Sequence, residues 1–151
     1  MPEARPHTLV AFDFGLRRIG IAAADTVTAS PAPRPAVQVL SDGPDWARIE
    51  HEIRRLQPQV LIVGIPYNDD GSASSLAAAA RSFGTELESR FGLKVHYVDE
   101  RFSSLEASAR LADSRRRGER GRRVRREDVD SAAAAIILER WLAGEGRIGE
   151  H

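Results

Sequence analysis

Three short apolar runs within the first forty residues constrain the fold of this 151-residue chain more than any other feature. Residues 8–14 and 18–24 are separated only by the short turn GLRR, and residues 36–40 form a third run. Strand-length runs that lie so close together are typical of antiparallel neighbours joined by short connections. The sequence therefore predicts that the fold opens with a three-stranded antiparallel meander.

After this meander, helical and strand-like patterns alternate along the chain. The predicted elements are a helix over 46–56, a strand over 60–64, a helix over 76–91, a strand over 93–100, a helix over 103–114 and a last helix from about 128 to 143. Three strands followed by such an alternation describe an α/β fold. We expect a mixed five-stranded sheet with helices on both faces.

Length and composition limit the organisation of the chain. A chain of 151 residues fits one domain, so we expect a single domain over 1–151 with a short tail at 144–151. No apolar stretch approaches the roughly 20 residues of a membrane span, so no membrane association is expected. The chain has no cysteine, which excludes disulfides and thiolate metal sites and agrees with a cytoplasmic location.

Positive charge is concentrated in one short segment. Residues 114–126 hold eight arginines and one glutamate, a net charge of +7, whereas residues 1–113 hold 12 basic and 15 acidic side chains, a net charge of −3. Two glycines and no apolar periodicity predict a flexible loop over about 114–127. We interpret it as a nucleic-acid contact that neutralises backbone phosphates, the alternative being a solvated loop without a partner. The candidate nucleic-acid-binding residues here are Arg115, Arg116, Arg117, Arg120, Arg122, Arg123, Arg125 and Arg126.

A carboxylate lies within the first apolar run. Asp13 is on the same predicted strand face as Leu9 and Ala11. A charge on that face has to be paired, neutralised or bound to a metal, because an isolated charge in a dry interior costs several kcal/mol. Two interpretations stay open, an ion pair with Arg17 or Arg18 in the following turn, or a functional site.

Asp130 is an acid on the apolar face of the last predicted helix. At 100° per residue it falls within about 40° of Ala134, Ile137 and Trp141 on the helical wheel. Asp128 points the opposite way and is better explained as an acid that stabilises the helix start. A similar role at the helix start is the alternative for Asp130. Two acids on apolar faces, from distant parts of the chain, suggest a shared site.

A third acid is expected from the strand over 93–100, which ends in Asp99 and Glu100. Their side chains point to opposite faces, so only one can join Asp13, and the residue pattern does not decide which. An all-oxygen set of ligands without cysteine or a histidine pair suits Mg²⁺ or Mn²⁺. Two such ions about 3.5–4 Å apart can activate water and stabilise the leaving oxygen of a phosphodiester.

Four motifs follow one another along the chain. They are FDFGLRRIG at 12–20, VGIPYNDDGS at 63–72, VDERFSSLEA at 98–107 and VDSAAAAIIL at 129–138. Together and in this order they resemble the YqgF/RuvX family of RNase H-like nucleases, a family of bacterial proteins associated with Holliday junction resolution and pre-16S rRNA processing. The resemblance covers about residues 8–143, and chance is a poor explanation for four motifs in the right order.

The resemblance implies a fold, a set of site residues and an activity. The fold would be RNase H-like, of the RuvC type. Asp13, Glu100 and Asp130 would be the catalytic acids that bind two Mg²⁺ or Mn²⁺ ions, so that Glu100 is chosen over Asp99. The activity would be that of a structure-selective endonuclease that hydrolyses phosphodiester bonds. Two arginines beside these acids are further candidate nucleic-acid contacts, Arg17 and Arg101, although a plain hairpin turn and simple neutralisation of the acids are the alternatives.

The motifs leave the substrate open between branched DNA and structured RNA. A Holliday junction resolvase makes two symmetric cuts, a need that a two-fold homodimer meets most simply. A nuclease that matures the 5′ end of pre-16S rRNA needs no such symmetry. A third alternative is a non-catalytic adaptor that binds RNA or a ribosome-assembly factor, although an adaptor has no use for carboxylates on buried faces.

Overall fold

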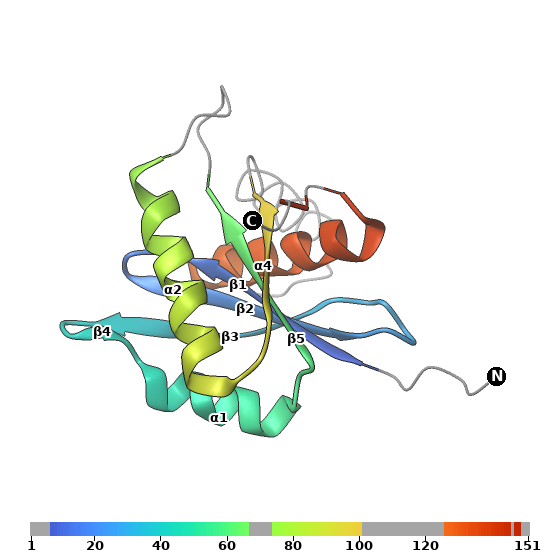
Figure 1. The fold of residues 1–151 in the computed structure, drawn as a ribbon, viewed down its shortest axis with the longest axis horizontal. Coiled ribbons are helices and arrows are strands. Elements are labelled where there is room, and N and C mark those ends of the chain that lie inside the picture. Colours follow the sequence, from blue (N-terminus) through green and yellow to red (C-terminus); the bar gives the residue numbers. More distant parts are fainter. Residues whose placement is uncertain (1–6, 67–73, 101–125, 146, 149–151) are drawn as a thin grey trace.

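The computed structural model describes residues 7–66, 74–100, 126–145 and 147–148 (Figure 1). Its strands are β1 (Thr8–Phe14), β2 (Arg18–Asp25), β3 (Ala32–Leu40), β4 (Gly43–Pro44), β5 (Val60–Ile65) and β6 (Val95–Asp99). Its helices are α1 (Trp46–Leu56), α2 (Ser75–Phe91) and α4 (Arg126–Ala143). One sheet has the strand order β4-β3-β2-β1-β5-β6.

The strand pairing confirms the predicted meander and the predicted mixed sheet. β1, β2 and β3 are antiparallel neighbours, whereas β5 is parallel to β1 and β6 is parallel to β5. The described residues form a sheet of six strands, one more than the predicted five. The sixth strand is β4, a two-residue edge that pairs with the end of β3 and is too short to produce a hydrophobic pattern.

Some element boundaries differ from the predicted ones. β3 begins at Ala32, four residues before the predicted start at 36, because Pro33 and Pro35 conceal the strand pattern. Prolines are tolerated near the edge of a sheet, where a backbone donor can be dispensed with. α4 begins at Arg126 rather than near 128. The predicted helix over 103–114 and the arginine-rich segment up to residue 125 lie outside the described residues.

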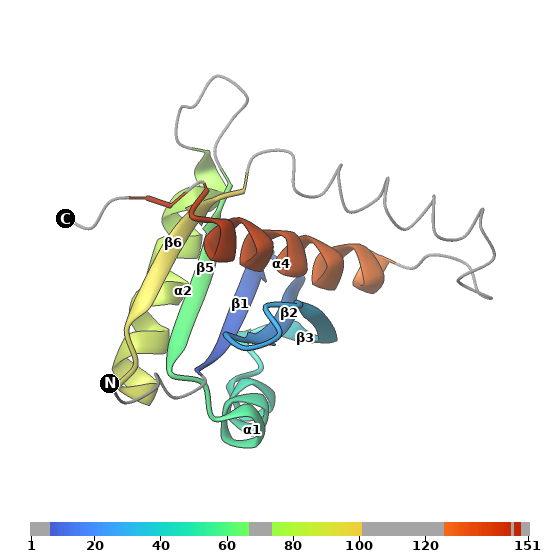
Figure 2. The same ribbon diagram turned by 90° about the vertical axis from the view of Figure 1, so that its right-hand side faces the viewer.

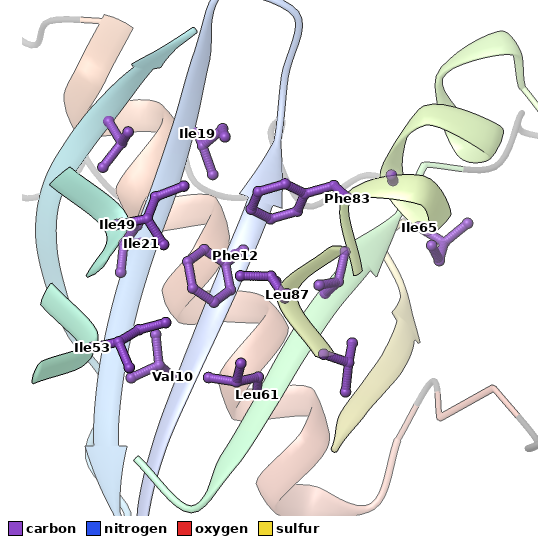
Figure 3. Packing of buried hydrophobic residues seen from close by; sticks show 14 of the residues in the cluster. Val10, Phe12, Ile19, Ile21, Ile49, Ile53, Leu61, Ile65, Phe83 and Leu87 are labelled. Carbon is purple, nitrogen blue, oxygen red and sulfur yellow. The ribbon is translucent and has the colours of Figure 1, made fainter. Parts of the chain in front are cut away.

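The helices form two layers, one on each face of the sheet. Figure 2 shows α4 crossing one face, with α1 and α2 on the opposite face. Val10 and Phe12 of β1 pack with α1 and α2, as Figure 3 shows, in a core that also contains Phe83. Leu9 and Ala11 pack with α4 in a second core. This alternation along β1 places Asp13 on the face that α4 covers.

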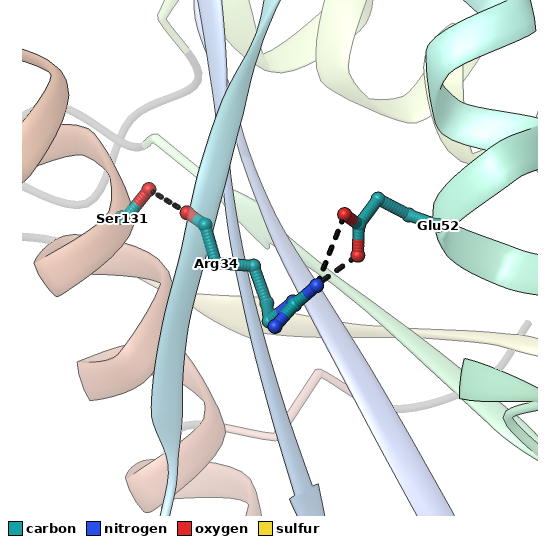
Figure 4. Close-up of polar contacts among 3 residues, drawn as sticks. All are labelled: Arg34, Glu52 and Ser131. Atoms are coloured by element: carbon teal, nitrogen blue, oxygen red, sulfur yellow. Dashed lines mark hydrogen bonds and ion pairs between the residues drawn. The ribbon is translucent and has the colours of Figure 1, made fainter. Parts of the chain in front are cut away.

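Arg34 of β3 connects the two helical layers through the sheet (Figure 4). Its guanidinium donates to both carboxylate oxygens of Glu52 on α1, from Nε at 3.1 Å and from Nη2 at 3.2 Å. Its backbone carbonyl accepts a hydrogen bond of 2.6 Å from the Ser131 hydroxyl on α4. Glu52 is buried, so the ion pair fixes β3 against α1, and the carbonyl in turn holds the first turns of α4.

Within the ranges that the structure describes, no helix is both long enough and apolar enough to cross a membrane. α4, at 18 residues, carries several charged side chains. Its buried part is instead rich in alanine, including Ala133 and Ala134. Small side chains allow α4 to lie close to the strands, and this close approach shapes the site described next.

Candidate active site

The carboxyl groups of Asp13 and Glu100 are joined by a hydrogen bond on the face of the sheet that α4 covers. Asp13 lies near the end of β1. Glu100 directly follows β6, and its backbone N–H donates to the Ile65 carbonyl at 3.1 Å, which continues the pairing with β5. Two carboxyl groups can share a hydrogen bond only if one of them holds a proton. Burial and the nearby charge of Asp13 favour the protonated form of Glu100 in this pair.

Gly64 makes room for this contact across the intervening strand. β5 lies between β1 and β6, and Gly64 is the β5 residue that pairs with Val98 of β6. A Cβ atom at Gly64 would lie 2.7 Å from Oε2 of Glu100 and 2.4 Å from Cδ1 of Ile137. Any side chain there would displace the carboxyl group that reaches toward Asp13.

A second glycine brings the backbone of α4 close to the strand beside Asp13. Gly20 of β2 is the pairing partner of Asp13 across the antiparallel ladder. A Cβ atom at Gly20 would lie 2.0 Å from the backbone carbonyl oxygen of Asp130. Glycine is the one residue that allows the helix to approach this closely, so Gly20 sets the position of Asp130 next to Asp13.

The Asp130 carboxylate is bonded to an arginine. Nε of Arg18, the first residue of β2, donates to Oδ2 of Asp130 at 2.8 Å. The two side chains are 20% and 24% exposed. Asp130 also raises the pKa of Asp13 through its negative charge, which places it within electrostatic range of the pair.

Both carboxyl groups of the pair have raised pKa values. The pKa of Asp13 is raised to about 6, mainly by burial and further by the charge of Asp130, although the hydrogen bond with Glu100 opposes the rise. Asp13 keeps some exposed surface, but its carboxyl group lies among protein atoms. The pKa of Glu100 is raised more strongly, first by burial and then by the charge of Asp13 and the hydrogen bond with it. The charge of Asp99 adds to this rise, and Arg140 opposes it.

The donor atoms present suit a hard divalent cation. Carboxylate oxygens are the ligands that Mg²⁺ and Mn²⁺ prefer, and the glycine at position 64 leaves space for the Glu100 carboxylate among them. Among the residues that the structure describes, however, no three acidic or histidine side chains converge closely enough to hold an ion together. Asp13 and Glu100 are in contact, and Asp130 is bonded to Arg18 instead.

The structure places some of the predicted site residues and leaves others undescribed. It brings Asp13 and Glu100 together, and it places Asp130 on the same face of the sheet. The catalytic role of these three acids stays a prediction. Arg17 lies exposed in the turn between β1 and β2. The other candidate nucleic-acid contacts fall outside the description: Arg101, Arg115, Arg116, Arg117, Arg120, Arg122, Arg123 and Arg125 entirely, and Arg126 in its side chain.

Sequence reasoning missed three residues that shape the site. It did not assign Arg18 to Asp130, having considered Arg18 only as a partner of Asp13. It gave no role to Gly20 or Gly64. The signal was present for both glycines, because a glycine inside a strand often marks a close approach of another backbone or group. Both lie on strands that neighbour β1, but their position relative to Asp13 depends on the register.

Solved structures with the same architecture define the fold class. RuvC of T. thermophilus in complex with a Holliday junction substrate matches with a TM-score of 0.56 at 13% identity, over 94% of this chain and 99% of that chain. A second Thermus thermophilus RuvC structure matches with a TM-score of 0.53 at 13% identity, over 91% and 95% of the two chains. At this identity the likeness concerns the fold alone. The fold is RNase H-like and of the RuvC type, as predicted.

Comparison of sequences gives the family. The family model RuvX, described as "Holliday junction resolvase", matches residues 7–144. A relative from Cronobacter sakazakii is 43% identical over 141 residues, which cover 92% of this chain and 98% of the relative. A relative from Coxiella burnetii is 46% identical over 134 residues, covering 88% and 90%. Both relatives carry the name "Putative pre-16S rRNA nuclease". The chain belongs to the RuvX family, which confirms the resemblance found from its four motifs.

Proposed function

We propose that this protein is a metal-dependent, structure-selective endonuclease that hydrolyses phosphodiester bonds in nucleic acid, in the manner of a Holliday junction resolvase. The observation that carries the proposal is the contact between the Asp13 and Glu100 carboxyl groups. Two acids held together on a buried face reduce the stability of the fold, and clusters of perturbed acids are typical of functional sites. Membership of the RuvX family supports a hydrolase that acts on nucleic acid.

Asp13, Glu100 and Asp130 are the residues that would hold Mg²⁺ or Mn²⁺, and two ions are expected. When bound, such cations supply Lewis acidity, a lowered pKa for the attacking water and charge stabilisation for the leaving oxygen. The chain itself supplies rigid positions for the ligands. Asp13 lies on the central strand β1, and Glu100 directly follows β6. Ligands that are positioned by such elements are held more accurately than ligands on loops.

The proton shared by Asp13 and Glu100 has a defined place in this proposal. Cation binding requires both groups as carboxylates, so it releases the proton to solvent. In the absence of a cation, the proton keeps the two acids from repelling each other. The protonated pair is therefore the state of the site without a cation. A cation that takes the place of the proton offsets the stability that the two buried acids cost the fold.

The family description and the RuvC-type fold support a branched DNA substrate, for which a homodimer is expected. The names of the relatives favour a second candidate, maturation of the 5′ end of pre-16S rRNA. Either substrate is a nucleic acid whose backbone phosphates would be neutralised by arginines, including the candidates predicted from the sequence. A non-catalytic adaptor is the least favoured function, because it gives no account of the carboxyl pair.

Cleavage assays on matched substrates test the proposal. The purified protein would be incubated with Mg²⁺ or Mn²⁺ and with an end-labelled four-way DNA junction, a linear duplex of the same sequence, and an RNA spanning the 5′ end of 16S rRNA. Symmetric cuts in the junction support the resolvase, and cuts in the RNA alone support rRNA maturation. Asp13→Asn should abolish either activity, whereas Asp42→Asn, a change of the same charge at an exposed turn, should not.

A further inference from the structure

Asp130 is held from two sides by the same strand. Gly20 of β2 lies against its backbone carbonyl, and Arg18, two residues earlier on the same face of β2, bonds its carboxylate. Residues Arg18 and Gly20 therefore fix the backbone and the side chain of Asp130 separately. The backbone contact cannot change without moving α4, whereas the side-chain contact depends on two rotatable groups.

The Arg18 contact differs in kind from the ion pair that Arg34 of β3 makes with Glu52. Arg34 binds Glu52 through two nitrogens, and Glu52 is 4% exposed in its side chain. Within the described residues, Arg18 binds Asp130 through Nε alone, and the Asp130 side chain is 24% exposed. Two parallel bonds to a buried carboxylate are strong and specific. One bond to a carboxylate that solvent can reach is the weaker arrangement and can be displaced by a cation.

The three acids have two different sets of contacts. The carboxyl groups of Asp13 and Glu100 are hydrogen-bonded to each other, and Asp130 acts on Asp13 through its charge. Arg18 supplies the positive charge that contacts Asp130 directly. Within the described residues the three acids do not converge as a set of metal ligands, and the Arg18 bond is the contact that retains the Asp130 carboxylate on the β2 side.

We propose that Arg18 is a positioning residue that holds the Asp130 carboxylate apart from the Asp13–Glu100 pair until a divalent cation replaces the guanidinium. The inference rests on the proposed function, because it requires a cation at these acids. Arg18 and the cation compete for one carboxylate, so Arg18 lowers the affinity of the site. The opposite role, an arginine that orients a metal ligand and strengthens the site, predicts the reverse effect of a substitution.

Manganese binding without nucleic acid distinguishes the two roles. The unbound Mn²⁺ signal would be followed by electron paramagnetic resonance for the wild type, Arg18→Gln, Arg18→Lys and Arg17→Gln. We expect Arg18→Gln to bind Mn²⁺ about fivefold more tightly than the wild type, the effect of removing one partly exposed ion pair. Arg17→Gln removes the same charge one residue away, at an exposed position, and should change the affinity less than about twofold.

A double-mutant cycle shows whether Arg18 acts through Asp130. In the Asp130→Asn background, Arg18→Gln should leave Mn²⁺ affinity unchanged, because the carboxylate for which Arg18 competes is gone. An NMR measurement on the wild-type protein tests the same contact without relying on the folding of a variant. The ¹⁵N–Hε resonance of Arg18 should shift on addition of Mg²⁺, whereas that of Arg34 should not.

Each result has a defined meaning. Weaker or unchanged Mn²⁺ binding by Arg18→Gln, or a fivefold effect that persists without the Asp130 carboxylate, overturns the proposal for Arg18 and leaves the metal site in place. An Arg18 Nε–H resonance that does not respond to saturating Mg²⁺ also overturns it. If the wild type binds no Mn²⁺ at millimolar concentration, the metal site and the proposed function fail together with this inference.

Discussion

Asp13 and Glu100 hold two carboxyl groups on a buried face of the sheet, and this burial makes the stability of the metal-free protein depend on pH. The pKa of Asp13 is near 3.8 in the unfolded chain and about 6 in the folded protein. Between these values the folded protein binds more protons than the unfolded chain, so its stability falls as the pH rises. The raised pKa of Glu100 acts in the same direction at higher pH.

Replacement of Asp13 should remove this loss of stability. We expect Asp13→Asn to be more stable than the wild type at pH 7 in the presence of a chelator, by an amount on the order of 2 kcal/mol. The difference should shrink as the pH is lowered to 4. Urea unfolding of both proteins at several pH values measures it. A wild type that gains stability from pH 4 to pH 7 relative to Asp13→Asn would contradict the raised pKa.

Gly64 has a testable role at the same scale. A Cβ atom there would meet the Glu100 carboxyl group and Ile137, so we expect Gly64→Ala to cost about 1–3 kcal/mol of stability and to reduce Mn²⁺ affinity at least tenfold. Calorimetry gives both quantities. Gly84→Ala on α2 is the matched control, because its Cβ would meet the Tyr97 ring on the other face of the sheet. It should reduce stability and leave Mn²⁺ affinity unchanged.

At the scale of elements, the hydroxyl of Ser131 helps to hold the start of α4 against the sheet. Ser131 adjoins Asp130 and donates to the Arg34 carbonyl at 2.6 Å. We expect Ser131→Ala to lower the free energy of unfolding by about 1 kcal/mol, and to weaken Mn²⁺ binding because Asp130 is less well held. Thr85→Ala removes a similar hydroxyl-to-carbonyl bond from an exposed turn of α2 and should leave Mn²⁺ binding intact. Equal effects of the two substitutions on Mn²⁺ binding would contradict an anchoring role for Ser131.

The elements also show how much of the fold and of the site could be predicted from the sequence alone. Periodicity predicted β1, β5 and α2 nearly to their observed ends, because each carries a regular apolar pattern. The face of Asp13 was also predictable, since Leu9 and Ala11 share it. The choice between Asp99 and Glu100 was not predictable from the residue pattern. It depends on the register of β6 against β5, and the sequences of two parallel strands that lie far apart in the chain do not reveal that register. The Arg18–Asp130 contact joins residues 112 positions apart and is likewise a tertiary property.

At the scale of the whole molecule, a bound cation should stabilise the fold. A ligand that binds the folded protein and not the unfolded chain adds about 2.7 kcal/mol when its concentration is one hundred times the dissociation constant. We therefore expect Mn²⁺ to raise the Tm of the wild type, and Glu100→Gln to abolish most of that rise. Differential scanning calorimetry with Mn²⁺ and with chelator measures the effect. An equal rise in both proteins would place the cation elsewhere on the molecule.

The central claim is that Asp13, Glu100 and Asp130 form one metal-dependent nuclease site. The most direct test maps cleavage of a four-way DNA junction and of a pre-16S rRNA fragment, at nucleotide resolution, by the wild type and by Glu100→Gln in the presence of Mn²⁺. We predict specific cuts by the wild type in at least one substrate, lost with chelator and reduced at least a hundredfold in the variant. Cleavage that survives in Glu100→Gln, or tight binding of both substrates by the wild type without any cut, would contradict this account.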